Sequence, residues 1–136
     1  MKLTITTTIF AVSACSALSF DLTDRSYIGL DKATIKSTYS CAPSFLVLGG
    51  DTRLVCYDTN ADKRALVFIL SNEKVVNVDI TPQDPPLIFN EAISSLQSQC
   101  EAGEDNVTFK CKNGTQAVVR DVGSSLTINL CLQGHC

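Results

Sequence analysis

Histidine and tryptophan are nearly missing from this chain, and both shortages limit the chemistry that it can perform. Of 136 residues, one is histidine and none is tryptophan. Catalysis by a serine or cysteine nucleophile usually depends on a histidine base. His135 stands beside the terminal Cys136, where side chains are poorly held in place. We therefore assign no catalytic residue.

Paired carboxylates are present, but they lack the surroundings of a glycosidase. Glu101, Glu104 and Asp105 form one acidic cluster, and Asp58 and Asp62 form another. Both clusters fall in stretches that are typical of solvated loops, and no tryptophan is available to build a groove for sugar. Cleavage of a glycosidic bond between two such acids is not expected.

Positive charge and metal-binding patterns are also scarce. Lysine and arginine total 11 against 14 acidic residues, which gives a net charge of −3 without runs of one sign. Binding to nucleic acid requires a basic patch, which the sequence does not contain. No C-x-x-C pair occurs, and the closest cysteines, Cys131 and Cys136, stand alone. We expect neither a metal nor a cofactor.

The N-terminus has the layout of a signal peptide. Met1 and Lys2 precede an uncharged run over residues 3–18, and Ala17 and Ser19 supply the small residues for cleavage. This run is shorter and more polar than a membrane span, which needs about 20 apolar residues.

We predict that residues 1–19 are removed, and that residues 20–136 form a single secreted domain without stable membrane insertion. An alternative is that residues 12–15 are a bacterial lipoprotein box, in which case Cys15 would carry lipid.

Removal of the leader also removes Cys15 and leaves an even number of cysteines. In an oxidising compartment they are expected to form three disulfides, although the sequence does not choose among the possible pairings. The predicted disulfide residues are Cys41, Cys56, Cys100, Cys111, Cys131 and Cys136.

β-branched and aromatic residues, a continuous apolar run and alternating apolar residues predict a series of strands from Thr52 onward. In the first group, Val76, Val78 and Ile80 are expected to share one face, and the polar residues 71–74 are expected to form a hairpin. In the second group, Asn113-Gly114 is a strong hairpin signal. The expected strands cover residues 52–58, 65–70, 75–80, 107–111, 115–122 and 126–132. Prolines within residues 81–86 should end the first group.

One helix is predicted between the two groups of strands. Asp84 can cap it, Pro85 suits its first position, and Gly103 can end it. A helical stripe then contains Phe89, Ala92, Ile93, Leu96 and Cys100. This stripe places Cys100 on the buried face, so its disulfide should tie the helix to the sheet. Residues 20–40 show no firm period.

The predicted fold class is therefore α+β: a disulfide-stabilised, predominantly antiparallel β-sheet packed against one α-helix.

Three short motifs are candidates for covalent processing. Asn106 and Asn113 each begin an N-x-T sequon, which makes both candidates for glycosylation. Lys63 and Arg64 form a dibasic pair of the kind that secretory proteases cut, although a cut there would split the predicted sheet.

The leader resembles those of small secreted cysteine-rich proteins of filamentous fungi. The residues that carry this resemblance are Met1-Lys2-Leu3-Thr4 and the run over residues 6–12. Many proteins of this class are effectors delivered to a host. Two further segments, Gly49-Gly50 before Cys56 and residues 100–103 before residues 109–111, are similar to a fungal major-allergen family that forms β-barrels.

The leading hypothesis is a secreted, non-enzymatic, cysteine-rich binding protein, a fungal effector that acts on a host extracellular or cell-surface protein. Lys110, Lys112, Gln116 and Arg120 are expected to project outward from neighbouring strands and form the partner-binding face. The alternatives are a secreted enzyme inhibitor or small hydrolase, and a fungal wall protein with an allergen-like β-barrel.

Overall fold

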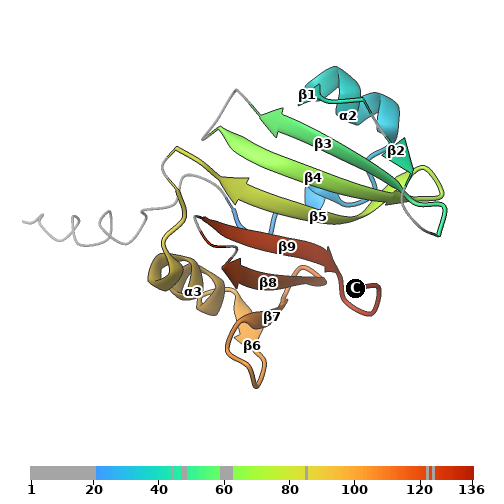
Figure 1. The fold of residues 1–136 in the computed structure, drawn as a ribbon. Helices are drawn as coiled ribbons and strands as arrows, with labels where there is room; N and C mark the ends of the chain where they lie inside the picture. Colours follow the sequence, from blue (N-terminus) through green and yellow to red (C-terminus); the bar gives the residue numbers. More distant parts are fainter. Residues whose placement is uncertain are drawn as a thin grey trace, which may run out of the picture.

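One antiparallel sheet is the main structural element of the part of the chain that the computed structural model describes, namely residues 21–43, 45–46, 49–58, 63–84, 86–121, 123 and 125–136. Within these residues the sheet has nine strands in the order β1-β3-β4-β5-β9-β8-β7-β6, and β2 also pairs with β3 (Figure 1). The predicted signal peptide lies outside the described residues.

The strands are β1 (Ser40–Cys41), β2 (Phe45–Leu46), β3 (Thr52–Asp58), β4 (Arg64–Ser71), β5 (Lys74–Pro82), β6 (Cys100–Ala102), β7 (Thr108–Cys111), β8 (Thr115–Asp121) and β9 (Leu126–Leu132). The helical elements are the 3-10 turn η2 (Arg25–Tyr27) and the helices α2 (Lys32–Thr38) and α3 (Phe89–Gln97). The predicted α+β class with three disulfides is confirmed, with two α-helices in place of one.

Both predicted hairpins are present, and each turns at residues that tolerate a left-handed backbone. Asn72 and Glu73 join β4 to β5 with φ values of 52° and 68°. Positive φ at both central residues matches the twist of the two strands. The turn between β7 and β8 includes Gly114, whose φ is 89°.

An irregularity in β5 changes which of its side chains face the core. The register with β4 shifts between Ile69 and Leu70, so that Ile69 pairs with Asn77 but Leu70 pairs with Val75. Val76 is the extra residue of this bulge, and Val75 is buried in its place. The prediction that Val76 shares the core face with Val78 and Ile80 was therefore wrong.

Strand β9 joins the two groups of strands at the centre of the sheet. It pairs with β5 on one side and with β8 on the other, although about forty residues separate it from β5 along the chain. Its core-facing residues Ile128 and Leu130 are fully buried. Its other face is buried as well, from Thr127 to Cys131.

Helix α3 begins later and ends earlier than predicted. Its N-cap is Ile88, not Asp84. A β-bridge between Gln83 and Pro86 holds the chain on both sides of the predicted start, and α3 begins only after it. Ala92 and Leu96 are buried, as expected, but Phe89 is exposed.

The predicted end of this helix was also wrong. Cys100 lies in strand β6, since the helix ends at Gln97, and Gly103 follows that strand. A helical stripe cannot continue through a residue with extended backbone, so Cys100 does not belong to the buried face of α3.

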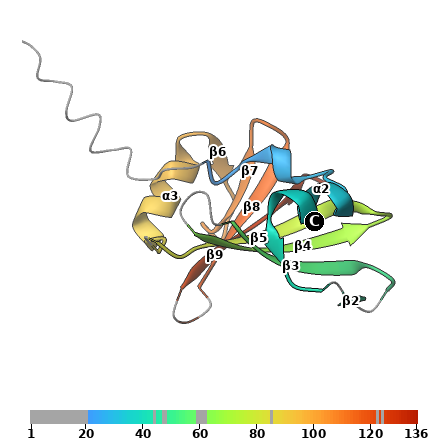
Figure 2. The ribbon, with the colours of Figure 1, turned by 90° about the horizontal axis from the view of Figure 1, so that it is seen from above.

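The N-terminal segment, which showed no period in the sequence, supplies part of the core. Leu22, Tyr27 and Ile35 are buried in the same cluster as the central strands. Asp31 caps α2 by accepting a hydrogen bond from the backbone nitrogen of Thr34 at 2.8 Å. Figure 2 shows this segment and both helices on one side of strands β3–β5.

Candidate functional site

All six cysteines predicted to form disulfides are paired, each with its neighbour in the sequence. The bridges are Cys41–Cys56, Cys100–Cys111 and Cys131–Cys136.

Two of these bridges hold the strands at the two ends of the sheet. Cys41 lies directly opposite Cys56 in the β1–β3 pair, and Cys100 lies opposite Cys111 in the β6–β7 pair. Strands β1 and β6, of two and three residues, are too short to be held firmly by backbone hydrogen bonds alone. The Cys100 disulfide therefore ties an edge strand to β7, and not a helix to the sheet as predicted.

The predicted partner-binding residues lie partly on one surface. Lys110 pairs with Gln116 across β7 and β8, and Arg120 follows Gln116 on the same face of β8. This face is opposite the one that carries the buried Phe109, Ala117 and Val119. We call it the outer face of the sheet.

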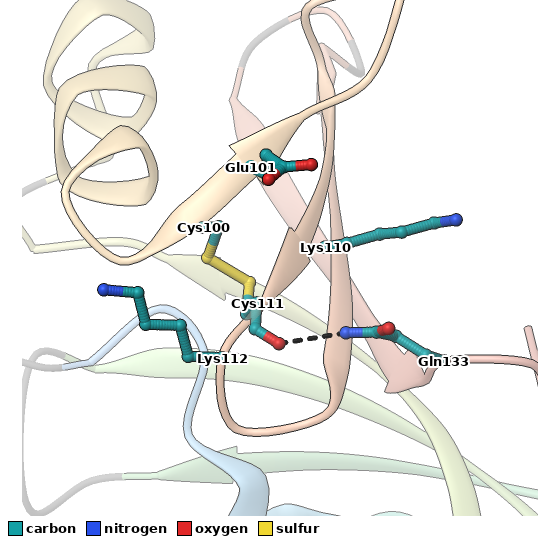
Figure 3. A pocket seen from close by; sticks show the side chains of 6 residues that line it. All are labelled: Cys100, Glu101, Lys110, Cys111, Lys112 and Gln133. Atoms are coloured by element: carbon teal, nitrogen blue, oxygen red, sulfur yellow. Dashed lines mark hydrogen bonds between the residues drawn. A yellow bond between two sulfur atoms is a disulfide. The ribbon is translucent and has the colours of Figure 1, made fainter.

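Lys112 does not join the other three on the outer face. Strand β7 ends at Cys111, so Lys112 enters the turn, where side chains no longer alternate. In Figure 3 its side chain points away from Lys110, on the side of the disulfide.

A shallow depression of about 390 Å³ lies around the end of the β6–β7 pair (Figure 3). It is lined by Cys100, Glu101, Lys110, Cys111, Lys112 and Gln133. The amide nitrogen of Gln133 donates to the carbonyl oxygens of Cys111 and Thr115, at 2.9 and 3.1 Å. The lining thus mixes two cations, one anion and an amide that is already bonded, which suits contact with a polar surface better than capture of a small apolar ligand.

The centre of the outer face is a hydrogen-bonded polar row that was not predicted. Asn129 is only 7% exposed, and its amide nitrogen donates to the side-chain oxygens of Asn77 at 2.6 Å and Asp79 at 2.8 Å. The hydroxyls of Thr81 and Thr127 share a hydrogen bond of 2.7 Å. Because each of these groups has a partner, the row is held in one arrangement.

A sequence signal for this row exists in the alternate positions of the two strands. Polar residues recur at 77, 79 and 81 in β5 and at 127 and 129 in β9. The apolar residues of β5 and β9 indicate the face toward the core. The polar residues between them indicate the face that carries the polar row.

The two sequons lie in different settings. Asn106 is exposed in the turn between β6 and β7, with a φ of 60°. Asn113 lies in the turn between β7 and β8, where its side chain is hydrogen-bonded to Thr23 and Thr115.

The dibasic pair is divided between a loop and a strand. Lys63 is exposed and lies 3.7 Å from the carboxylate of Asp84. Arg64 begins β4, and its Nη1 donates to the hydroxyl of Tyr27 at 2.8 Å. The bond after Arg64 belongs to a strand paired with both β3 and β5. A protease would have to open the sheet to reach it.

Tyr27 is a buried phenol beside this arginine. Burial raises its pKa to about 12, and Arg64 opposes that increase. Its ring also packs near those of Tyr39 and Phe68, at centroid distances of 6.5 and 5.9 Å. Through these contacts, Tyr27 and Arg64 contribute to the packing at the edge of the core.

The described residues do not assemble a catalytic or metal-binding cluster that we can identify. Within them, no three histidine, cysteine or acidic side chains converge as metal ligands. Glu101, Glu104 and Asp105 are all exposed, as is His135. None of the helices in the described part of the chain has the length and apolar character to cross a membrane.

Comparison with family models, with curated proteins and with solved structures found no match to this chain. The geometry of the outer face is therefore the basis for a functional proposal.

Proposed function

We propose that the chain is a secreted, non-enzymatic binding protein of the fungal effector class, and that it contacts a host extracellular or cell-surface protein through its outer face. The observation that carries this proposal is an open sheet face with a bonded polar centre and exposed cations on β7 and β8.

The polar centre favours a rigid recognition surface. Asn129 uses both amide hydrogens within the row, so few of its groups need to be reordered when a partner binds. Binding costs less free energy when the contacting groups are already arranged.

The cations give the surface a preferred kind of partner. Lys110 and Arg120 are both exposed, in a chain whose net charge is −3. The same face carries Glu101, which lies opposite Lys110, and Asp79 of the polar row, so the cations act as individual contacts that can pair with acidic side chains on a partner. We therefore propose an acidic patch on a folded host protein as the contact site.

The disulfides support an extracellular setting for this function. Three bridges in one small domain are typical of secreted proteins and resist unfolding where proteases are present. The proposal of secretion rests on these bridges and on the leader sequence.

The test is affinity capture from host extracellular fluid, followed by binding measurements with the purified partner. Lys110→Glu and Arg120→Glu should each weaken binding by about tenfold, the loss expected when a favourable contact becomes repulsive. Lys36→Glu is the matched control, because Lys36 is also exposed but lies on α2, away from the outer face.

Equal binding by all three variants would refute the outer face as the binding surface. Turnover of a substrate would favour the hydrolase alternative. Inhibition of a host enzyme by a variant that no longer binds the captured partner would favour the inhibitor alternative.

A further inference from the structure

The two sequons differ in what their asparagine side chains already do. In the turn between β6 and β7, Asp105 provides the bonds that hold the backbone. Its carboxylate accepts hydrogen bonds from the backbone nitrogens of Val107 at 3.0 Å and Thr108 at 2.9 Å, and from the Thr108 hydroxyl at 2.8 Å. These bonds lower the pKa of Asp105, and the bond from the Val107 nitrogen has the largest effect. The carboxyl group of Asp105 therefore stays ionised. The turn is thus supported without the side chain of Asn106.

Asn113, in contrast, is a connector between distant parts of the chain. Its Oδ1 accepts from the backbone nitrogen of Thr115 at 3.1 Å and from the Thr115 hydroxyl at 2.6 Å. Its Nδ2 donates to the backbone oxygen of Thr23 at 2.8 Å. Thr115 is 0% exposed and Thr23 is 1% exposed, whereas Asn113 itself is exposed, so these bonds join an exposed side chain to buried partners and are partly buried.

A second contact closes the N-terminal segment over the same turn. The Nη1 atom of Arg25 donates to the backbone oxygen of Asn113 at 2.5 Å. A Cβ placed on Gly114 would lie 2.6 Å from this Nη1 atom. A methyl group on the residue after Asn113 would therefore displace the Arg25 side chain.

N-glycosylation would change the atom that makes the connection. The reaction joins C1 of an oligosaccharide to the asparagine Nδ2, breaks the bond from C1 to the diphosphate of a lipid-linked donor, and releases one amide proton. At Asn106 the new group extends into solvent. At Asn113 it would occupy the space between the turn and the segment that contains Thr23 and Arg25.

We propose that Asn106 is the glycosylation site of the folded chain, and that Asn113 is an unmodified latch that holds the N-terminal segment to the β7–β8 turn. A sugar on Asn113 would leave one hydrogen on Nδ2 and would compete with the N-terminal segment for the space beside Thr23 and Arg25. This inference depends on secretion of the chain, but not on the binding role of the outer face.

The test uses two matched variants of the full chain, Asn106→Asp and Asn113→Asp, secreted from yeast. Aspartate has the shape of asparagine but accepts no sugar. At position 113 it still accepts from Thr115, but a carboxylate oxygen replaces the amide donor and faces the backbone oxygen of Thr23, which it repels. Glycan sites are mapped by enzymatic release of the sugar in ¹⁸O-labelled water, and the N-terminal segment is followed by hydrogen exchange of peptides that contain Thr23.

Wild-type protein should carry sugar at Asn106 and none at Asn113. Asn106→Asp should lose the sugar and leave exchange at Thr23 unchanged. Asn113→Asp should keep the sugar and exchange roughly tenfold faster at Thr23, the effect of losing one partly buried hydrogen bond.

Sugar on Asn113 in the folded product, a wild-type protein without sugar on Asn106, or unchanged exchange in Asn113→Asp would each overturn the proposal. Expression in bacteria tests the latch alone, because no sugar is added there. Asn113→Asp should still exchange faster at Thr23 than the wild-type protein.

Discussion

Replacement of both Cys100 and Cys111 by alanine should lower the free energy of unfolding by about 3 kcal/mol. The bridge joins residues with a sequence separation of 11. Without it, the unfolded chain gains the freedom of an open loop of that length, which is worth about 3 kcal/mol at room temperature. Since a small domain is stable by only about 5–15 kcal/mol, this loss is large.

The Cys131–Cys136 bridge is the matched comparison. Its sequence separation is 5, for which the same relation gives about 2 kcal/mol. In each pair one cysteine is buried, Cys111 or Cys131, but Cys100 also packs against the core whereas Cys136 is exposed, so loss of packing adds to the difference expected from loop length.

The assay is unfolding by guanidinium chloride for the oxidised protein and the two double-alanine variants, with the slope fitted for each. The variant that lacks the Cys100–Cys111 bridge should unfold at a lower concentration of guanidinium chloride than the variant that lacks Cys131–Cys136. If removal of Cys131–Cys136 costs as much as removal of Cys100–Cys111, loop length does not determine what these bridges contribute.

Two further predictions concern the N-terminal segment. The pKa of Tyr27 is 10.0 in the unfolded chain and about 12 in the fold, so the folded state keeps the proton longer. Its contribution to stability should be complete below about pH 10 and decline as the pH rises toward 12, and Tyr27→Phe should reduce this decline in denaturant titrations at several alkaline pH values. Leu22→Ala should cost about 2–5 kcal/mol, because Leu22 is fully buried, whereas Val55→Ala should cost less than about 1 kcal/mol, because Val55 is 41% exposed. Equal melting temperatures for these two variants would show that the segment is not part of the core.

The strands that the sequence predicted best are those with a local signal. The expected bounds of residues 52–58 and 126–132 are those of β3 and β9, since β-branched and aromatic residues in the first and alternating apolar residues in the second are visible within a single segment. The turn at Asn113-Gly114 is equally local.

The features that were missed depend on contacts between distant segments. Nothing within β5 indicates that β9 is its neighbour, or that Val76 bulges where the strand meets β4. The burial of Leu22 depends on strands that follow much later in the chain. Cys100 fits a helical spacing, but its pairing with Cys111 requires an extended strand.

The candidate site was predicted in part for the same reason. Alternation along a strand correctly places Lys110, Gln116 and Arg120 on one face, because each lies within a strand. Lys112 lies one residue beyond the end of β7, and an error of one residue in a strand boundary is enough to misplace it.

The order of the disulfides along the chain has a consequence for how the protein matures. The six cysteines in the described part of the chain pair with their neighbours in the sequence, at separations of 15, 11 and 5 residues. Under the proposal of secretion, the chain would enter an oxidising compartment from its N-terminus, and every second of these cysteines to arrive would find its partner already present. Short loops also close with a smaller loss of entropy than long ones, which favours these pairs over the distant alternatives. In a secreted chain, each of these bridges could therefore form before the cysteines of the next bridge arrive, which would limit the number of wrong pairings.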